Sequence, residues 1–179
     1  TGVRIDIMRS YVADLESDTP TSAERRAAIG ARIAELGNAE NESWGIEFGY
    51  VYQGSPVIAA ELDVQPPQDP VRYVPTTMPG ARLPSTFLAD GSALLDRLGP
   101  WFTLVNFGNL DVNGFEAAAK RAGIPLQILT LDEPELRSVY GRDALLVRPD
   151  HHIAWRGSEQ SGAEADRVLA RALGWEAAA

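Results

Sequence analysis

Two amphipathic helices are predicted near the start of the chain. Residues 4–15 carry apolar side chains at helical spacing, and the pattern breaks at Asp18-Thr19-Pro20. Residues 21–36 carry the second apolar stripe, which Gly37-Asn38 closes. Thr21 and Glu24 form a capping box at its start, in which each side chain satisfies a free backbone N–H.

Residues 46–53 alternate between two faces, as the residues of a β-strand do. One face is apolar and aromatic, and consists of Ile46, Phe48, Tyr50 and Tyr52. A lone strand with two helices leaves both strand edges unpaired and this face uncovered. We therefore expect residues 1–64 to be the C-terminal remnant of a larger domain. The uncovered aromatic face predicts that the isolated chain self-associates or keeps this part loosely ordered.

Six prolines between Asp63 and Pro84 predict a stiff, extended connector over residues 65–84, since each proline fixes φ and removes a backbone donor. From residue 85 onward, strand and helix patterns alternate at short intervals. Strands are predicted at residues 86–89, 101–107, 126–131, 144–147 and 153–156. Helices are predicted to begin at Ser92, at Asp111 or Asn113, at Pro134 and at Ser161.

This order, βαβαβαββα, predicts an α/β fold: a thioredoxin-like mixed sheet over residues 85–179, with helices on both faces. Parallel crossovers come first and an antiparallel hairpin last. The chain contains no cysteine, which excludes disulfides, thiolate metal sites and dithiol chemistry. The absence of cysteine fits a cytoplasmic location, which we expect.

Charge and hydropathy exclude two classes of partner. The net charge is −9 and Lys120 is the only lysine, whereas nucleic-acid binding depends on clustered Lys and Arg. No apolar run approaches the roughly 20 residues that cross a bilayer. We expect neither a nucleic acid nor a membrane as a partner.

Several short motifs in this order resemble the C-terminal region of FAD-dependent aromatic hydroxylases, the group that includes phenol, hydroxyphenylpropionate and polyketide hydroxylases. They are Trp44–Tyr50 (WGIEFGY), Pro79–Pro84 (PGARLP), Gly99–Leu104 (GPWFTL), Tyr140–Asp143 (YGRD) and Val147–Gly157 (VRPDHHIAWRG). The resemblance covers nearly the whole chain. Two positions depart from it: Ser85 stands where the family has a histidine, and Asp150-His151 replaces the usual Asp-Gly of the hairpin turn, where a positive φ is expected.

The resemblance implies a monooxygenase that uses NAD(P)H and O₂. The whole enzyme would reduce FAD, form a flavin hydroperoxide and hydroxylate an aromatic ring. It also implies an N-terminal flavin-binding domain as partner, in the same polypeptide or a separate chain, and leaves a homo-oligomer open. No G-x-G-x-x-G loop occurs in this chain. We therefore expect this chain to be a structural portion with no catalytic, cofactor-binding or metal-binding residue of its own.

The only histidines are His151 and His152. Adjacent side chains of a strand diverge, and a metal site would need further ligands. A structural role is favoured for both, over a metal site or a general base.

Two positions mark where a thioredoxin would carry its chemistry. Asn106-Phe107-Gly108-Asn109 stands at the position of the redox pair, and Arg142-Asp143-Ala144 at that of the cis-proline. Without cysteine the first can be neither nucleophile nor redox couple. A plain strand-to-helix turn is favoured there over a binding loop.

Five further charged or aromatic residues could make specific contacts. Trp155 and Arg156 alternate in the last strand, so one should face the core and the other solvent or a partner. Arg148 and Asp150 could pair across the hairpin. Arg82 could contact the flavin domain through a carboxylate, although an ordinary surface arginine is favoured.

A hydrolytic triad has no support, because Ser55, Ser85 and Ser92 have no nearby histidine in the predicted topology. One alternative to the hydroxylase interpretation remains open at this point. The chain could be a stand-alone, non-redox thioredoxin-fold module that binds another protein.

Overall fold

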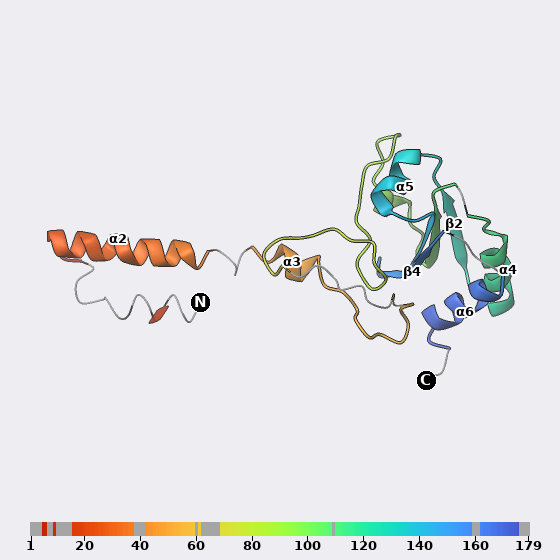
Figure 1. Cartoon of the computed structure of the whole chain (residues 1–179), viewed down its shortest axis with the longest axis horizontal. Helices are drawn as coiled ribbons and strands as arrows, with labels where there is room; N and C mark the ends of the chain where they lie inside the picture. The colour runs from red at the N-terminus through yellow and green to blue at the C-terminus, as the bar shows by residue number, and fades with distance from the viewer. Residues whose placement is uncertain are drawn as a thin grey trace.

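The computed structural model of the chain describes residues 5, 6, 9, 16–37, 42–59, 61, 69–108, 110–158 and 162–175. Helix α2 (Pro20–Glu35) lies apart from a unit of sheet and helices that the C-terminal half of the chain forms (Figure 1). Most of the helix predicted at residues 4–15 lies outside the described residues.

A four-stranded mixed sheet forms the centre of this unit. Its strands are β1 (Phe102–Asn106), β2 (Leu126–Thr130), β3 (Ala144–Val147) and β4 (Ile153–Gly157), in the spatial order β2-β1-β3-β4. β1 runs parallel to β2 and antiparallel to β3, and β3 and β4 form an antiparallel hairpin. This is the topology of a thioredoxin-like sheet, so the predicted α/β fold class is confirmed.

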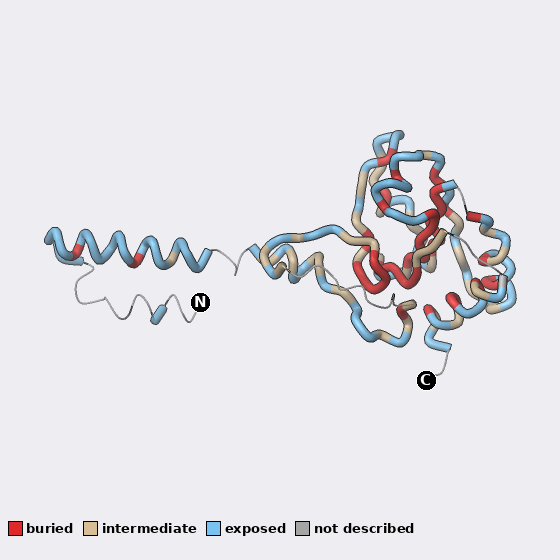
Figure 2. The backbone as a smooth tube through the Cα atoms, viewed as in Figure 1, coloured by how far each residue is buried: buried red, intermediate tan, exposed pale blue. Residues whose placement is uncertain are grey.

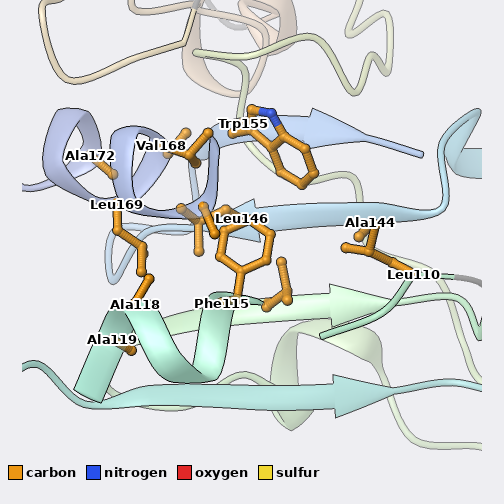
Figure 3. Close-up of a cluster of buried hydrophobic side chains, with 13 residues drawn as sticks. Leu110, Phe115, Ala118, Ala119, Ala144, Leu146, Trp155, Val168, Leu169 and Ala172 are labelled. Carbon is orange, nitrogen blue, oxygen red and sulfur yellow. The ribbon is translucent and has the colours of Figure 1, made fainter. Parts of the chain in front are cut away.

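Helices cover both faces of the sheet. α4 (Asn113–Ala122) and α6 (Gly162–Ala172) pack against each other on one face, where they enclose a cluster around Phe115, Leu146 and Trp155 (Figure 3). α5 (Pro134–Tyr140) covers the other face. Figure 2 shows the buried positions concentrated on the strands between these layers.

The ends of two helices follow the sequence signals. α4 is closed by Gly123 and α5 by Gly141, with φ of 69° and 71°. Both values lie in the left-handed region that glycine adopts without steric cost. Pro134 opens α5 at its first turn, where the missing N–H costs no helical hydrogen bond.

The first predicted strand and helix of this unit are smaller than expected. Residues 86–89 contribute only an isolated bridge from Phe87 to Ala93, and the helix expected from Ser92 is a 3₁₀ turn, η2 (Leu94–Arg97). The reason is that this segment bonds to itself. The N–H of Leu94 donates to the Thr86 carbonyl over 2.9 Å, so these backbone groups do not join the sheet.

The strand predicted at residues 46–53 is wrong. The structure has the short helix α3 (Trp44–Glu47) there, followed by an isolated bridge at Val51. Gly45 explains the difference: a Cβ at this position would lie 1.6 Å from the Asp69 carbonyl oxygen. The glycine lets α3 pack directly on the backbone of another segment, which outweighs the strand-like alternation of side chains.

The start of α2 also differs from the expected capping box at Thr21 and Glu24. Thr19 is the N-cap, and its hydroxyl accepts the N–H of Ser22 over 3.2 Å. Pro20 explains this, because proline is favoured at the first helical position. The Ser161 start of the last helix lies outside the described residues.

Candidate functional site

The outer edge of β4 is covered by a segment from the proline-rich part of the chain. Gly80 N–H donates to the Ile153 carbonyl over 2.7 Å, and Ile153 N–H donates to the Ala81 carbonyl over 2.9 Å. Leu83 N–H donates to the His151 carbonyl over 2.8 Å. Ala81 and Leu83 are buried. This edge of the sheet is therefore paired, as a sheet edge needs to be if it is not to recruit another chain.

A second segment pairs with the first. Tyr52 N–H donates to the Gly80 carbonyl over 3.0 Å, and Val51 bridges Ala81. Gly80 has a φ of 94°, and a Cβ there would lie 3.1 Å from the Tyr52 carbonyl oxygen. The close approach of residues 51–52 thus depends on a glycine at position 80.

A β-bulge in β4 provides a further attachment point. The register pairs Leu146 with Trp155 and Val147 with Ile153, so Ala154 is skipped. Its carbonyl accepts the N–H of Ala59 over 2.8 Å. The bulge thereby supplies a backbone acceptor to the segment that precedes the proline-rich part.

His152 is buried under two tyrosine rings. Its side chain lies 4.4 Å from the ring of Tyr52 and 5.0 Å from that of Tyr50, measured between ring centroids. Nδ1 lies 3.0 Å from the Asp150 carbonyl oxygen, and Nε2 is buried without a hydrogen-bond partner among the described residues. Burial lowers the pKa of the imidazole, against the opposing effect of Asp150. A neutral ring therefore fits this environment.

Arg156 holds the second side-chain contact of β4. Its Nε donates to Glu61 over 2.7 Å, a second nitrogen donates to the other carboxylate oxygen over 2.5 Å, and a third donates to the Thr77 hydroxyl over 2.8 Å. Thr77 in turn donates to the Tyr140 carbonyl over 2.9 Å. The bidentate bond from Arg156 lowers the pKa of Glu61 despite partial burial.

We call these contacts the β4 clasp: Tyr50 and Tyr52 on His152, and Glu61 and Thr77 on Arg156. The clasp joins residues 50–59, 61 and 77–83 to His152 and to strand β4. It contains tilted ring contacts, an ion pair and backbone bonds. Such an arrangement fixes the relative position of chain segments. Its role is therefore structural.

Three expectations about this hairpin are confirmed. Trp155 is buried in the core beside Phe115, whereas Arg156 faces the Glu61 partner. Arg148 and Asp150 pair at 3.1 Å across the turn. His151 has a φ of 65°, the positive value that its place in the turn requires.

At the position of a thioredoxin redox pair, the Asn106 side chain bonds the backbone of the loop. Its side-chain oxygen accepts the N–H groups of Gly108 and Leu110, each over 3.2 Å, and its nitrogen donates to the Leu110 carbonyl over 3.1 Å. Asn106 is 5% exposed, so its side chain stabilises the β1–α4 turn from inside the protein. Asn109 lies outside the described residues.

Asp143, from the predicted cis-proline position, is buried and forms an ion pair with Arg137. Its backbone carbonyl accepts the N–H of Phe107 over 2.8 Å. The two positions where a thioredoxin carries its chemistry thus contact each other here through the backbone.

The three serines considered from the sequence lie outside the clasp, whereas Arg82 lies beside it. Ser92 donates to Asp90 over 2.6 Å within a turn. Ser55 accepts the N–H of Ile58 with its backbone carbonyl, and Ser85 is exposed. Arg82 lies over the ring of Phe48, 5.7 Å from its centroid.

Two kinds of feature are absent from the described residues. No three His, Asp or Glu side chains there lie close enough together to hold a metal ion. No helix in the described ranges combines the length and the apolar character needed to cross a bilayer.

Sequence reasoning missed Glu61 and Thr77. Glu61 lies 95 residues before its partner Arg156, and neither Glu61 nor Thr77 belongs to a recognisable motif. Tyr50 and Tyr52 did carry a signal, their aromatic alternation, but it was interpreted as the open face of a strand.

Comparison with known proteins identifies relatives along nearly the whole chain. The family described as aromatic-ring hydroxylase, C-terminal, matches residues 76–175. The FAD-dependent monooxygenase apdD of Emericella nidulans is 34% identical in an alignment 172 positions long, which covers 90% of this chain and 27% of that protein. Phenol 2-monooxygenase of a Pseudomonas species is 29% identical in an alignment 160 positions long, which covers 79% of this chain and 26% of that protein.

Solved structures agree with this assignment. The structure of the rebeccamycin biosynthetic enzyme RebC with reduced flavin has a TM-score of 0.81 and 30% identity, over 98% of this chain and 33% of that one. The chain thus spans about a quarter to a third of the length of these relatives. The family match covers more than half of the chain and confirms the resemblance read from its motifs, so this chain belongs to the aromatic-ring hydroxylases and corresponds to their C-terminal part.

Proposed function

We propose that this chain is the C-terminal structural portion of an FAD-dependent aromatic-ring hydroxylase that uses NAD(P)H and O₂ in the cytoplasm. Residues 1–64 complete its flavin/substrate domain, residues 65–84 connect, and residues 85–179 form the thioredoxin-like domain. The β4 clasp carries the proposal. It fastens residues 50–61, on the proposed catalytic side, to the last strand of the thioredoxin-like sheet.

The residues of this chain do not fit the flavin. The β1–α4 connection is a strand–loop–helix, the arrangement whose backbone N–H groups bind a pyrophosphate in dinucleotide-binding folds. Here the side chain of Asn106 already accepts the N–H groups of Gly108 and Leu110. We therefore place FAD and NAD(P)H in an N-terminal domain outside this chain, where the flavin would supply the oxygen chemistry.

The work of this chain is then mechanical. The ion pair of Glu61 with Arg156 and the tilted ring contacts of Tyr50 and Tyr52 with His152 hold the tail of the catalytic body in one orientation. Aromatic hydroxylation requires a site that orients the ring and excludes water. A domain fixed against the outside of that body supports this requirement through stability rather than through a reacting group.

The test compares the 179-residue chain with the full-length enzyme. We expect the full-length protein to retain FAD and to consume NAD(P)H in the presence of a phenolic or polyketide substrate. We expect the chain alone to bind no FAD in a fluorescence titration. Micromolar FAD binding by the chain alone, or a full-length protein that carries no flavin, would overturn the proposal.

A second candidate is the stand-alone, non-redox interaction module. One observation favours it: both faces of the sheet have their own helical cover, so the sheet unit has a complete core without further chain. The reading frame separates the two candidates. An upstream extension with a glycine-rich strand–loop–helix supports the hydroxylase, and a frame that begins near Thr1 supports the module.

A further inference from the structure

A groove lined by aromatic residues lies on the segment before the thioredoxin-like sheet. We call it the aromatic groove. It has a volume of about 700 Å³ and is lined by Glu42, Trp44, Phe48, Val71, Arg72 and Tyr73. Trp44 is 55% exposed. An exposed aromatic cluster with an indole at its rim is typical of a contact site for another protein surface.

The rings of the groove are ordered by contacts with one another. Trp44 stacks on Phe48 with centroids 5.6 Å apart and an interplanar angle of 19°, and Tyr73 meets Phe48 edge-on at 6.3 Å. The Arg82 guanidinium lies over the Phe48 ring. The aromatic anchors are therefore positioned before any partner arrives, which reduces the entropy lost on docking.

The backbone beneath the rings is equally fixed. The Asp69 carboxylate accepts the N–H groups of Val71 and Arg72, each over 2.9 Å. Gly45 lets α3 lie directly on the Asp69 carbonyl. The groove is thus a built surface and its two walls are joined by close backbone contact.

The groove is also attached to the sheet. Arg82 contacts Phe48 on one side and forms an isolated bridge with His152 on the other. Tyr50, two residues after Phe48, contacts the ring of His152 at a centroid distance of 5.0 Å. Through the β4 clasp, a partner bound in the groove would be held in a defined orientation relative to the thioredoxin-like sheet.

Two facts point to the partner. The chain matches 27% of the length of the apdD monooxygenase and 33% of that of RebC, so most of each relative has no counterpart in it. The family match begins at residue 76, after the groove. The groove therefore belongs to the part of the chain that continues toward the larger body.

Helix α2 also indicates that this part of the chain contacts a larger body. Within Pro20–Glu35, Ser22 and Ile29 are the only buried residues, although the helix has 16 residues. Such a helix is marginal without packing. It precedes α3 in the chain and lies away from the sheet (Figure 2). Helix α2 and the aromatic groove around α3 thus both expose surfaces that the thioredoxin-like sheet unit does not cover.

We infer that the rest of the flavin-binding body of the same enzyme covers the aromatic groove, and that apolar side chains of that body pack on the outer surfaces of Trp44, Phe48 and Tyr73. This inference rests on the proposed function and adds the location of the contact. The rim residues Glu42 and Arg72 offer one charge of each sign to the partner.

The experiment is oxidative footprinting of tryptophan, with mass spectrometry to locate the product. The chain offers its own controls: Trp101 and Trp175 are 59% and 60% exposed, close to Trp44, and Trp155 is 7% exposed. In the full-length enzyme we expect the oxidation rate of Trp44 to fall roughly tenfold from its value in the 179-residue chain, as for the buried centre of an interface. Trp101 and Trp175 should stay within about twofold, because nothing in the inference covers them.

FAD content is measured on the same sample, so that the two proposals fail separately. If the full-length enzyme holds FAD and Trp44 reacts as fast as Trp101, the docking inference is overturned and the proposed function stands. If Trp44 is protected in a full-length protein without FAD, the surface that covers the groove does not belong to a flavin-binding body, and the inferred partner is wrong. Protection of Trp44 in the 179-residue chain that grows with concentration would assign the groove to a second copy and also overturn the inference.

A pair of variants gives an independent measurement. Trp44→Ala and Trp101→Ala each remove an exposed indole, so both should leave the unfolding midpoint of the 179-residue chain nearly unchanged. In the full-length enzyme, Trp44→Ala should lower the midpoint and Trp101→Ala should not. Equal effects of the two variants in the full-length enzyme contradict the inference.

Discussion

Removal of the Glu61 carboxylate tests the β4 clasp most directly. In Glu61→Ala, Arg156 loses two hydrogen bonds, of 2.7 and 2.5 Å, and keeps only the one to Thr77 among its described contacts. The Arg156 side chain is 13% exposed, so water reaches it poorly. The variant therefore leaves a cation that is largely buried and only partly paired.

The expected loss lies between two known limits. Exposed ion pairs contribute about 0.2–1 kcal/mol, and a fully buried charge left unpaired costs about 3–5 kcal/mol. Glu61 is 26% exposed and Arg156 is 13% exposed, which places this pair between the limits. We expect Glu61→Ala to reduce the free energy of unfolding by about 2 kcal/mol, within the range for hydrogen bonds to charged groups.

Urea denaturation of the 179-residue chain measures this loss, and the chain provides a matched control. Arg121 and Asp166 also form a two-pronged pair with bonds of 2.7 Å, but their side chains are 57% and 47% exposed. Asp166→Ala should cost at most about 0.5 kcal/mol, as for surface pairs. Neither variant should change the m-value, because the folded state keeps its size.

The pH dependence supplies a second readout. Arg156 holds the pKa of Glu61 below its ordinary value. The ion pair therefore stabilises the fold fully at pH values above the ordinary pKa of a glutamate. This stabilisation is lost as pH falls through the folded-state pKa of Glu61. The stability of Glu61→Ala should therefore fall less steeply with acid than that of the wild type. Equal costs for Glu61→Ala and Asp166→Ala, together with parallel pH curves, would refute the reasoning.

Three further predictions follow from single positions. His151→Gly should raise the free energy of unfolding by about 0.5–1 kcal/mol in urea, because the φ of 65° strains any residue with a Cβ; a loss would show that the imidazole makes a needed contact. Phe115→Ala should cost about 3–5 kcal/mol on the same assay, since the ring is fully buried against Trp155, and a cost below that of surface variants contradicts the packing. Burial raises the pKa of Tyr140 to about 12, so alkaline absorbance titration should show a late phenol that is missing in Tyr140→Phe.

The elements that the sequence predicted well are those whose local signals agree with their packing. The hairpin of β3 and β4 has two short apolar runs around a turn, and the cost of His151 in that turn was foreseen from the residue type. α4 and α5 each end at a glycine with positive φ. In these places local chemistry alone determines the backbone.

The errors arise where a contact with a distant segment decides the backbone. The alternation around Phe48 favours a strand locally, but Gly45 packs on Asp69, which the sequence does not place nearby. The ion pair of Glu61 with Arg156 was missed for the same reason. The division at residues 64 and 84 remains a proposal, and the family match begins at residue 76, within the proposed connector.

The placement of polar groups around the sheet explains how a thioredoxin-like fold can serve a task without thiols. At the end of β1, where a redox pair would stand, Asn106 satisfies the free backbone groups of the turn internally. At β4, the outer edge instead receives the backbone of residues 80–83 and the side chain of Glu61. The free backbone groups of the loop are thus bonded within the loop, whereas the hydrogen-bonding groups at the edge of β4 bind other segments of the chain. An edge strand can bind a neighbouring segment along its whole length, so a fold used this way is suited to fastening one part of a larger enzyme to another.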